Sequence, residues 1–192
     1  MKMFKKFLLA FLFAAALFNV TAASAAVVNL NLTDTVQVGS TFTVEVWANE
    51  LFAGLQTDEE FLAFGMSVAN NSPELFSFTG VTIATPFADD SALLTLDAAG
   101  SAFPGMSNQP DNQSMLLASL TFFANSAGNG TLGVRSDLTD PNQGLIFFKN
   151  GAMSLNADLN VNVSAVPLPA ALPLLLSGMG LLVGVARHRN KF

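Results

Sequence analysis

The sequence predicts an all-β protein: an antiparallel two-sheet sandwich of about nine strands, of jelly-roll type, flanked by an N-terminal signal helix and a C-terminal transmembrane helix. Short segments alternate apolar and polar residues, which places the two sets on opposite faces of a strand. Asn-Gly pairs, which favour tight hairpins, lie between several of these segments. Helical periodicity is nearly absent between the two ends of the chain.

The N-terminus has the composition of a Sec-type signal peptide over residues 1–25. Three lysines precede the apolar run 7–18, and the small-x-small sequence Ala23-Ser24-Ala25 follows it. This order is typical of a cleaved secretory signal, so we expect the mature chain to begin at Ala26.

The next part of the chain, residues 26–165, is long enough for one domain. Apolar and polar residues alternate along its expected strands. This pattern is typical of half-buried antiparallel strands, which have one face on the core and the other in water. The expected strands, in order, are 28–33, 42–48, 61–68, 75–83, 92–96, 115–123, 132–134, 145–148 and 153–164.

Turn chemistry supports two hairpins within this domain. Asn129-Gly130 separates the strand at 115–123 from the next one, and Asn150-Gly151 precedes the last strand. Asn-Gly readily takes the positive φ angles that two-residue hairpins need. Residues 51–60 are expected to hold one helical turn.

The domain is strongly acidic and poor in catalytic side chains. All fourteen Asp and Glu lie within it, against Arg135 and Lys149 alone, so its formal charge is 2 − 14 = −12. Such a field repels nucleic acid. There is no cysteine, and the single histidine, His188, lies near the C-terminus. Thiol chemistry, histidine-based triads and zinc sites are therefore excluded from the domain.

The C-terminal segment 166–192 has three parts: a proline-rich hinge, an apolar run expected to form a transmembrane helix over 170–186, and a basic tail at 187–192. Positive charge on the C-terminal side alone places the tail in the cytoplasm and the domain outside it.

These three parts, in this order, resemble the PEP-CTERM sorting signal of Gram-negative bacteria that make exopolysaccharide. The resemblance implies sorting and processing by an exosortase-type membrane protease. Leu168 stands where the name-giving motif of the family has glutamate. The residues that the resemblance assigns to sorting and processing are Val166, Pro167, Leu168, Pro169, Arg187 and Arg189.

The domain itself resembles the cohesin-like or carbohydrate-binding-module-like β-sandwich. Residues 36–44 are similar to the opening strands of that group, 61–81 to the next two, and 117–132 to a later hairpin. The resemblance concerns the fold and implies no shared ligand.

Three groups of residues are candidates for a site. Trp47 is the only tryptophan and lies on the face opposite Phe42, so it offers a platform for a sugar ring or a protein partner, unless the following loop covers it. Asp137, Asp140 and Asn142 offer oxygen ligands for calcium, although these residue types also form ordinary turns. The acidic run at 58–60 is expected to be a solvated loop, with a carboxylate-pair hydrolase as the remote alternative.

Together these features predict an exported, non-enzymatic protein of the cell surface or extracellular matrix, with a structural or adhesive role in exopolysaccharide or biofilm. It would pass through an intermediate anchored in the inner membrane, with an exosortase as partner and with exopolysaccharide or another surface protein as further partners. No cofactor is expected apart from the candidate calcium. The alternatives are a glycan- or protein-binding module that uses the sheet face around Trp47, and a secreted carboxylate-dependent hydrolase.

Overall fold

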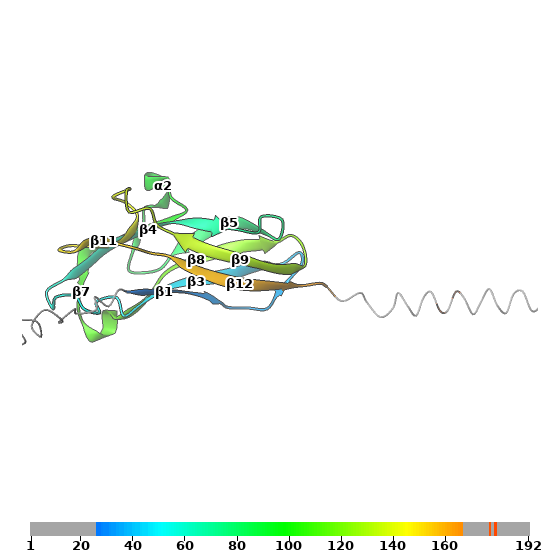
Figure 1. The fold of residues 1–192 in the computed structure, drawn as a ribbon, viewed down its shortest axis with the longest axis horizontal. Coiled ribbons are helices and arrows are strands. Elements are labelled where there is room, and N and C mark those ends of the chain that lie inside the picture. Colours follow the sequence, from blue (N-terminus) through cyan, green and yellow to red (C-terminus); the bar gives the residue numbers. More distant parts are fainter. Residues whose placement is uncertain (1–25, 167–176, 178, 180–192) are drawn as a thin grey trace, which may run out of the picture.

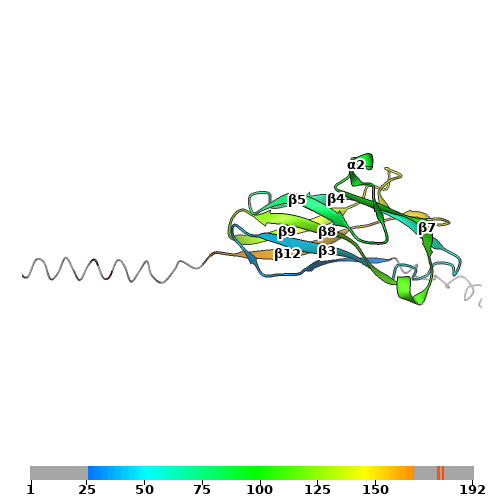
Figure 2. The same ribbon diagram turned by 180° about the vertical axis from the view of Figure 1, so that it is seen from behind.

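The computed structural model describes residues 26–166, together with Ser177 and Met179. Within this part of the chain, two β-sheets pack face to face as a sandwich (Figure 1 and, from behind, Figure 2). The expected signal peptide, the basic tail and all of the expected transmembrane helix at 170–186 except Ser177 and Met179 lie outside the described residues. Among the residues that are described, no helix has both the length and the apolar character needed to cross a membrane.

The first sheet has four strands, and each neighbouring pair is antiparallel. Its strands, in spatial order, are β1 (Val27–Leu32), β3 (Thr41–Asn49), β8 (Ser114–Ala124) and β5 (Phe76–Ile83).

The second sheet is built around β4 (Glu60–Asn70), which pairs with β7 (Ala98–Ser107), β10 (Gly144–Phe147) and β9 (Gly128–Arg135). β9 pairs with β12 along its length, and β12 pairs in parallel with β2 over two residues. The remaining elements are β2 (Val36–Gln37), β6 (Ala88–Asp89), α2 (Ser91–Leu94), the 3-10 helix η1 (Pro110–Asn112), β11 (Gly151–Met153) and β12 (Ala157–Ser164).

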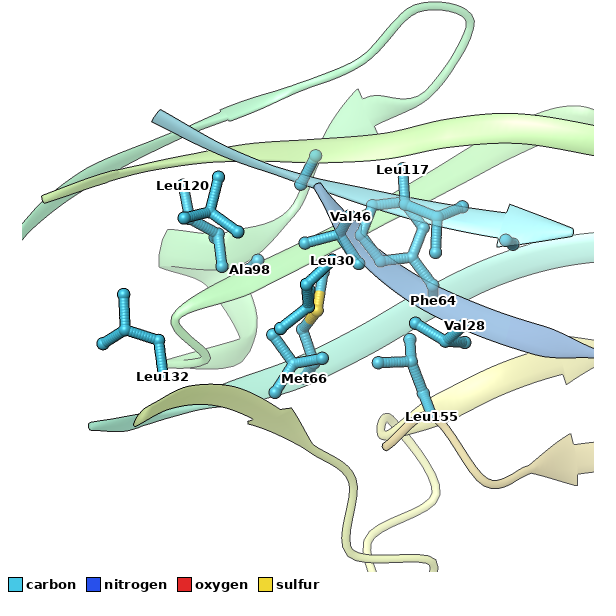
Figure 3. Packing of buried hydrophobic residues seen from close by; sticks show 14 of the residues in the cluster. Val28, Leu30, Val46, Phe64, Met66, Ala98, Leu117, Leu120, Leu132 and Leu155 are labelled. Atoms are coloured by element: carbon cyan, nitrogen blue, oxygen red, sulfur yellow. The ribbon is translucent and has the colours of Figure 1, made fainter. Parts of the chain in front are cut away.

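The inward-facing residues of the two sheets form one hydrophobic core (Figure 3). Phenylalanine supplies much of it: the rings of Phe42 and Phe122 stack with centroids 5.5 Å apart, and those of Phe61 and Phe147 are 5.3 Å apart. Such aromatic pairs contribute about 0.5–1.5 kcal/mol beyond the area that they bury. The all-β, two-sheet prediction is therefore confirmed.

The described residues form twelve strands rather than nine, and one of the expected strands is wrong. Residues 92–96 belong to α2 and the turn after it, because the Asp89 carboxylate accepts the Ser91 N–H and Thr95 ends the helix at a φ of 57°. The long strand β7 follows at Ala98–Ser107. Its alanines, glycines and proline give no strand signal, and pairing with β4 overrides that weak propensity. Residues 51–60 form successive tight turns instead of a helical turn.

The last expected strand, 153–164, is split into β11 and β12. At the break, Leu155 is fully buried, and the Ser136 hydroxyl accepts its N–H at 2.8 Å. The Asn156 side chain accepts the Ser136 N–H in turn. These bonds let the chain pass from β10, the neighbour of β11, to β9, the neighbour of β12.

Of the two Asn-Gly pairs, the structure confirms one as a turn. Gly151, with a φ of 71°, joins β10 to β11. Asn129 and Gly130 instead lie inside β9. Glycine is needed at position 130 because a Cβ there would lie 2.5 Å from the ring of Phe76.

Candidate functional surfaces

Trp47 lies on the outer face of the four-stranded sheet, where β3 runs between β1 and β8. Asn29 of β1 and Leu116 of β8 are its cross-strand partners. The indole N–H donates to the Glu45 carboxylate at 2.8 Å, which fixes the ring beside that acid. Trp47 is half-buried and is not one of the residues that form the core.

The loop after β3 does not use its large apolar side chains to cover Trp47. Leu51 and Phe52 are buried in the core, and the Phe52 ring contacts that of Phe147 with centroids 5.9 Å apart. The outer face around Trp47 carries hydroxyls and amides on β1, β3 and β8, together with the apolar side chains of Leu116 and Val27. It therefore combines one aromatic ring and one carboxylate on an open sheet, an arrangement suited to stacking against a ligand.

Asp137, Asp140 and Asn142 lie in the exposed loop between β9 and β10. Asp137 accepts hydrogen bonds from the backbone N–H and the hydroxyl of Thr139, and Asp140 accepts from the backbone N–H of Asn142 and the side chain of Gln143. The pKa of Asp137 is lowered by its bonds to Thr139, and the pKa of Asp140 is lowered by its bonds to Asn142 and Gln143.

These carboxylates thus serve the turn in which they lie. Within the described part of the chain, no three His, Cys, Asp or Glu side chains are grouped so that they would hold a metal ion. Calcium binding by this loop stays a prediction.

The acidic run at 58–60 is not the solvated loop that the sequence predicts. Glu59 is fully buried, and its carboxylate accepts the N–H groups of Glu60 and Lys149 and the side-chain amide of Asn150. Asp58 pairs with the Lys149 ammonium, whose hydrogen bond and charge lower the Asp58 pKa. A carboxylate whose two oxygens are both occupied by protein donors holds the β10–β11 turn in place and is not poised for proton transfer.

Of the residues assigned to sorting, the described part of the chain includes Val166 alone. It is 57 % exposed. Within residues 26–166, the last buried residue is Val163, at 3 % exposure, and the Ser164 carbonyl accepts the Val38 N–H. Pro167, Leu168, Pro169, Arg187 and Arg189 lie outside the described residues.

A row of polar side chains on the outer face of β9 and β12 was not anticipated as a site. The Asn162 side chain donates to that of Asn129 at 2.5 Å, and the Thr131 hydroxyl donates to Asn160 at 2.9 Å. Two adjoining hollows of about 360 and 720 Å³ lie over this row, and Asn160 and Asn162 line both. The alternating asparagines of β12 are the signal in the sequence that marks this face.

With the geometry established, the fold can be compared with solved structures. The cohesin module of a family 33 glycoside hydrolase from Clostridium perfringens matches with a TM-score of 0.53 at 14% identity, over 74% of this chain and 99% of that one. A type II cohesin domain from the cellulosome of Acetivibrio cellulolyticus matches with a TM-score of 0.39 at 12% identity, over 75% of this chain and 93% of that one.

The first match shows that the described domain has a cohesin-like β-sandwich fold, as the sequence predicts. No protein-family model and no curated protein sequence matches the chain. At this identity the likeness concerns the fold alone.

Proposed function

We propose that the chain is an exported, non-enzymatic protein of the cell surface or extracellular matrix, with a structural or adhesive role in exopolysaccharide or biofilm. A protease of the exosortase type sorts it at the inner membrane and cuts it near residues 166–169. The domain is then delivered outside the cell, where it acts by binding.

The observation that carries this proposal is that the fold closes before the sorting segment begins. Among residues 26–166, Val163 is the last one buried in the core, and Ser164 pairs with Gln37 of β2. Ala165 and Val166 are exposed. The described chain has therefore left the core where the cut is proposed, and the exposed residues at this point are accessible to a protease.

The chemistry of the domain supports a role without catalysis. It has no cysteine or histidine, and its one fully buried carboxylate, Glu59, is occupied by three protein donors. Fold likeness to a cohesin module agrees with a binding domain, but the role rests on the residues themselves.

Mass spectrometry of the mature ends tests this proposal. The protein is recovered from membrane, surface and medium fractions of the producing cells, with and without the sorting protease. We expect the extracellular form to begin at Ala26 and to end within 166–169, and we expect the uncut form to stay in the membrane when the protease is absent. Pro167→Ala with Pro169→Ala should slow the cut, whereas Pro141→Ala, at an exposed proline of the domain, should not. An extracellular protein that retains residues 187–192 would contradict the proposal.

A second candidate function is binding of a glycan or a partner protein at the sheet face around Trp47. The bond from the indole to Glu45 favours it, because it fixes the ring on an open face. As the only tryptophan of the chain, Trp47 reports directly by fluorescence. Quenching or a spectral shift on adding a ligand, together with loss of binding in Trp47→Ala and partial recovery in Trp47→Phe, would support this site. An unchanged spectrum at saturating ligand would rule it out for that ligand.

A further inference from the structure

The hollows over β12 form one continuous surface, which we call the amide trough. One side is formed by the outer faces of β9 and β12, and the other by the bend between β1 and β2. Its polar lining includes Asn129, Thr131, Asn160, Asn162, Thr33 and Ser164. The volumes of the two hollows, about 360 and 720 Å³, lie in the range typical of small-ligand sites.

The side chains of the amide trough are held in place and still have hydrogen-bonding capacity. The bonds from Asn162 to Asn129 and from Thr131 to Asn160 fix three amides across two strands. Within residues 26–166, the Nδ2 groups of Asn129 and Asn160 and the Oδ1 atom of Asn162 have no protein partner. Fixed groups of both kinds, donors and acceptors, lower the cost of ordering a ligand.

The charge of the amide trough differs from that of the rest of the domain. Asp34 is its one ionisable side chain, although the domain as a whole carries a formal charge of −12. Just beyond the trough, Asp158 is paired with Arg135. An anionic ligand would be repelled by the surrounding field. The lining itself has one carboxylate, Asp34, and otherwise uncharged amides and hydroxyls, which suit a neutral ligand.

We propose that the amide trough binds a segment of neutral polysaccharide. This inference rests on the proposed adhesive function and names the site and the ligand class. Sugar hydroxyls donate and accept, as the amides require, while the apolar face of a sugar ring can lie against Leu32, the partly exposed apolar side chain of the lining.

The competing occupant is an added β-strand from another protein chain. β12 pairs with β2 only at Val163 and Ser164, so much of its second edge has no strand partner among the described residues. The lining favours the sugar, because Asn129 and Thr131 lie across the sheet face on β9, out of reach of a strand added at that edge.

Binding of the full-length chain, in a sugar-free detergent, to dextran, laminarin and galactomannan tests the proposal, with anionic alginate as the comparison. The trough variant is Asn160→Ala with Asn162→Ala. The matched control is Asn29→Ala with Asn31→Ala, which removes two exposed amides at the same spacing from β1, on the other sheet. All four asparagines are exposed, so both variants should fold, and their thermal unfolding midpoints check this.

We expect the wild-type chain to bind at least one neutral polysaccharide in preference to alginate. The trough variant should bind about tenfold more weakly or worse, because two hydrogen-bonding side chains are lost. The control should keep the wild-type affinity.

Three results would overturn the proposal: no binding to any neutral polysaccharide, an equal loss of binding in the control, or an oligomeric state that changes in the trough variant without polysaccharide. The last result would assign the edge of β12 to strand addition, and an equal loss in the control would move the site to the face around Trp47. The proposed function is tested separately. If the protein is exported and cut normally but binds no polysaccharide, the proposal for the amide trough is rejected and the proposed export and processing stand.

Discussion

Two acidic segments that look alike in the sequence have opposite roles in the structure. Residues 58–60 and residues 137–142 are both short, rich in Asp, Glu and Asn, and flanked by strands. Glu59 in the first segment is fully buried, whereas Asp137 in the second is exposed. Exposure therefore does not follow from acidity, and the partners of each carboxylate explain the difference.

The carboxylates differ in how far along the chain their partners lie. Glu59 accepts from Lys149 and Asn150, which are 90 and 91 residues away. Asp137 accepts from Thr139, two residues away. A long-range bond to a buried charge exists only in the folded domain and so depends on the global fold. A turn bond forms locally and contributes little to cooperativity.

The largest effect is expected when the buried carboxylate is removed. Glu59→Ala removes the buried carboxylate and leaves three partly buried donors without their acceptor, so the free energy of unfolding should fall by about 3 kcal/mol or more. Glu59→Gln, which keeps one acceptor oxygen, should lose roughly half as much. Urea unfolding measures both, with Glu60→Ala at the exposed neighbour as control. Equal stabilities of the Glu59 and Glu60 variants would show that the buried bonds do not hold the domain.

A smaller effect is expected from the partner side chain. Asn150→Ala leaves one buried oxygen of Glu59 without its donor, which should cost about 1–3 kcal/mol. Asn142→Ala is the matched control in the second segment, because its bond to Asp140 uses the backbone N–H and survives the substitution. The comparison fails if the two asparagine variants unfold at the same urea concentration.

The contribution of the second segment, residues 137–142, to stability should depend on pH. The pKa values of Asp137 and Asp140 are lowered in the folded state by their turn hydrogen bonds. The ionised forms therefore stabilise the fold above the ordinary value of 3.8, and this contribution is lost as the pH falls through the lowered folded-state values. Asp137→Asn with Asp140→Asn should be less stable than wild type at neutral pH, and the difference should vanish well below pH 3.8. A difference that persists in acid would mean that the charges are not its source.

The smallest effect is expected at the ion pair between Asp58 and Lys149, because both side chains are exposed to solvent. Asp58→Asn should change the unfolding midpoint only slightly, and less at high salt, since ions screen surface charges. Midpoints recorded at low and high salt measure this. A large fall in the unfolding midpoint that does not depend on salt would mean that Asp58, like Glu59, stabilises the fold through its contacts with residues 149–150.

The alternation of residues was sufficient to predict the all-β class and which side chains of β3 face the core. Phe42, Val44 and Val46 are buried and Trp47 lies on the other face, as their parity requires. The absence of cysteine, and of histidine from the domain, also follows from sequence alone, and it limits the chemistry whatever the fold.

The sequence could not predict β7 or the break at Leu155, because both depend on which strand the segment meets. Gly130 has the sequence of a turn but lies in a strand, since the ring of Phe76 requires the space. The amide trough was missed for a similar reason: its two sides, the bend at 32–36 and the end of β12, are more than a hundred residues apart in the chain.

By itself, the sequence of this protein determined the class of fold, the faces of a few strands such as β3, the acidic charge and the lack of thiol and imidazole chemistry in the domain. These are local or additive properties: a period of two needs only neighbouring residues, and charge needs only a count. The tertiary structure alone decided that Glu59 is buried and that asparagines from two strands share one trough. Each of these depends on which distant segments meet, and that is settled by packing of the whole core.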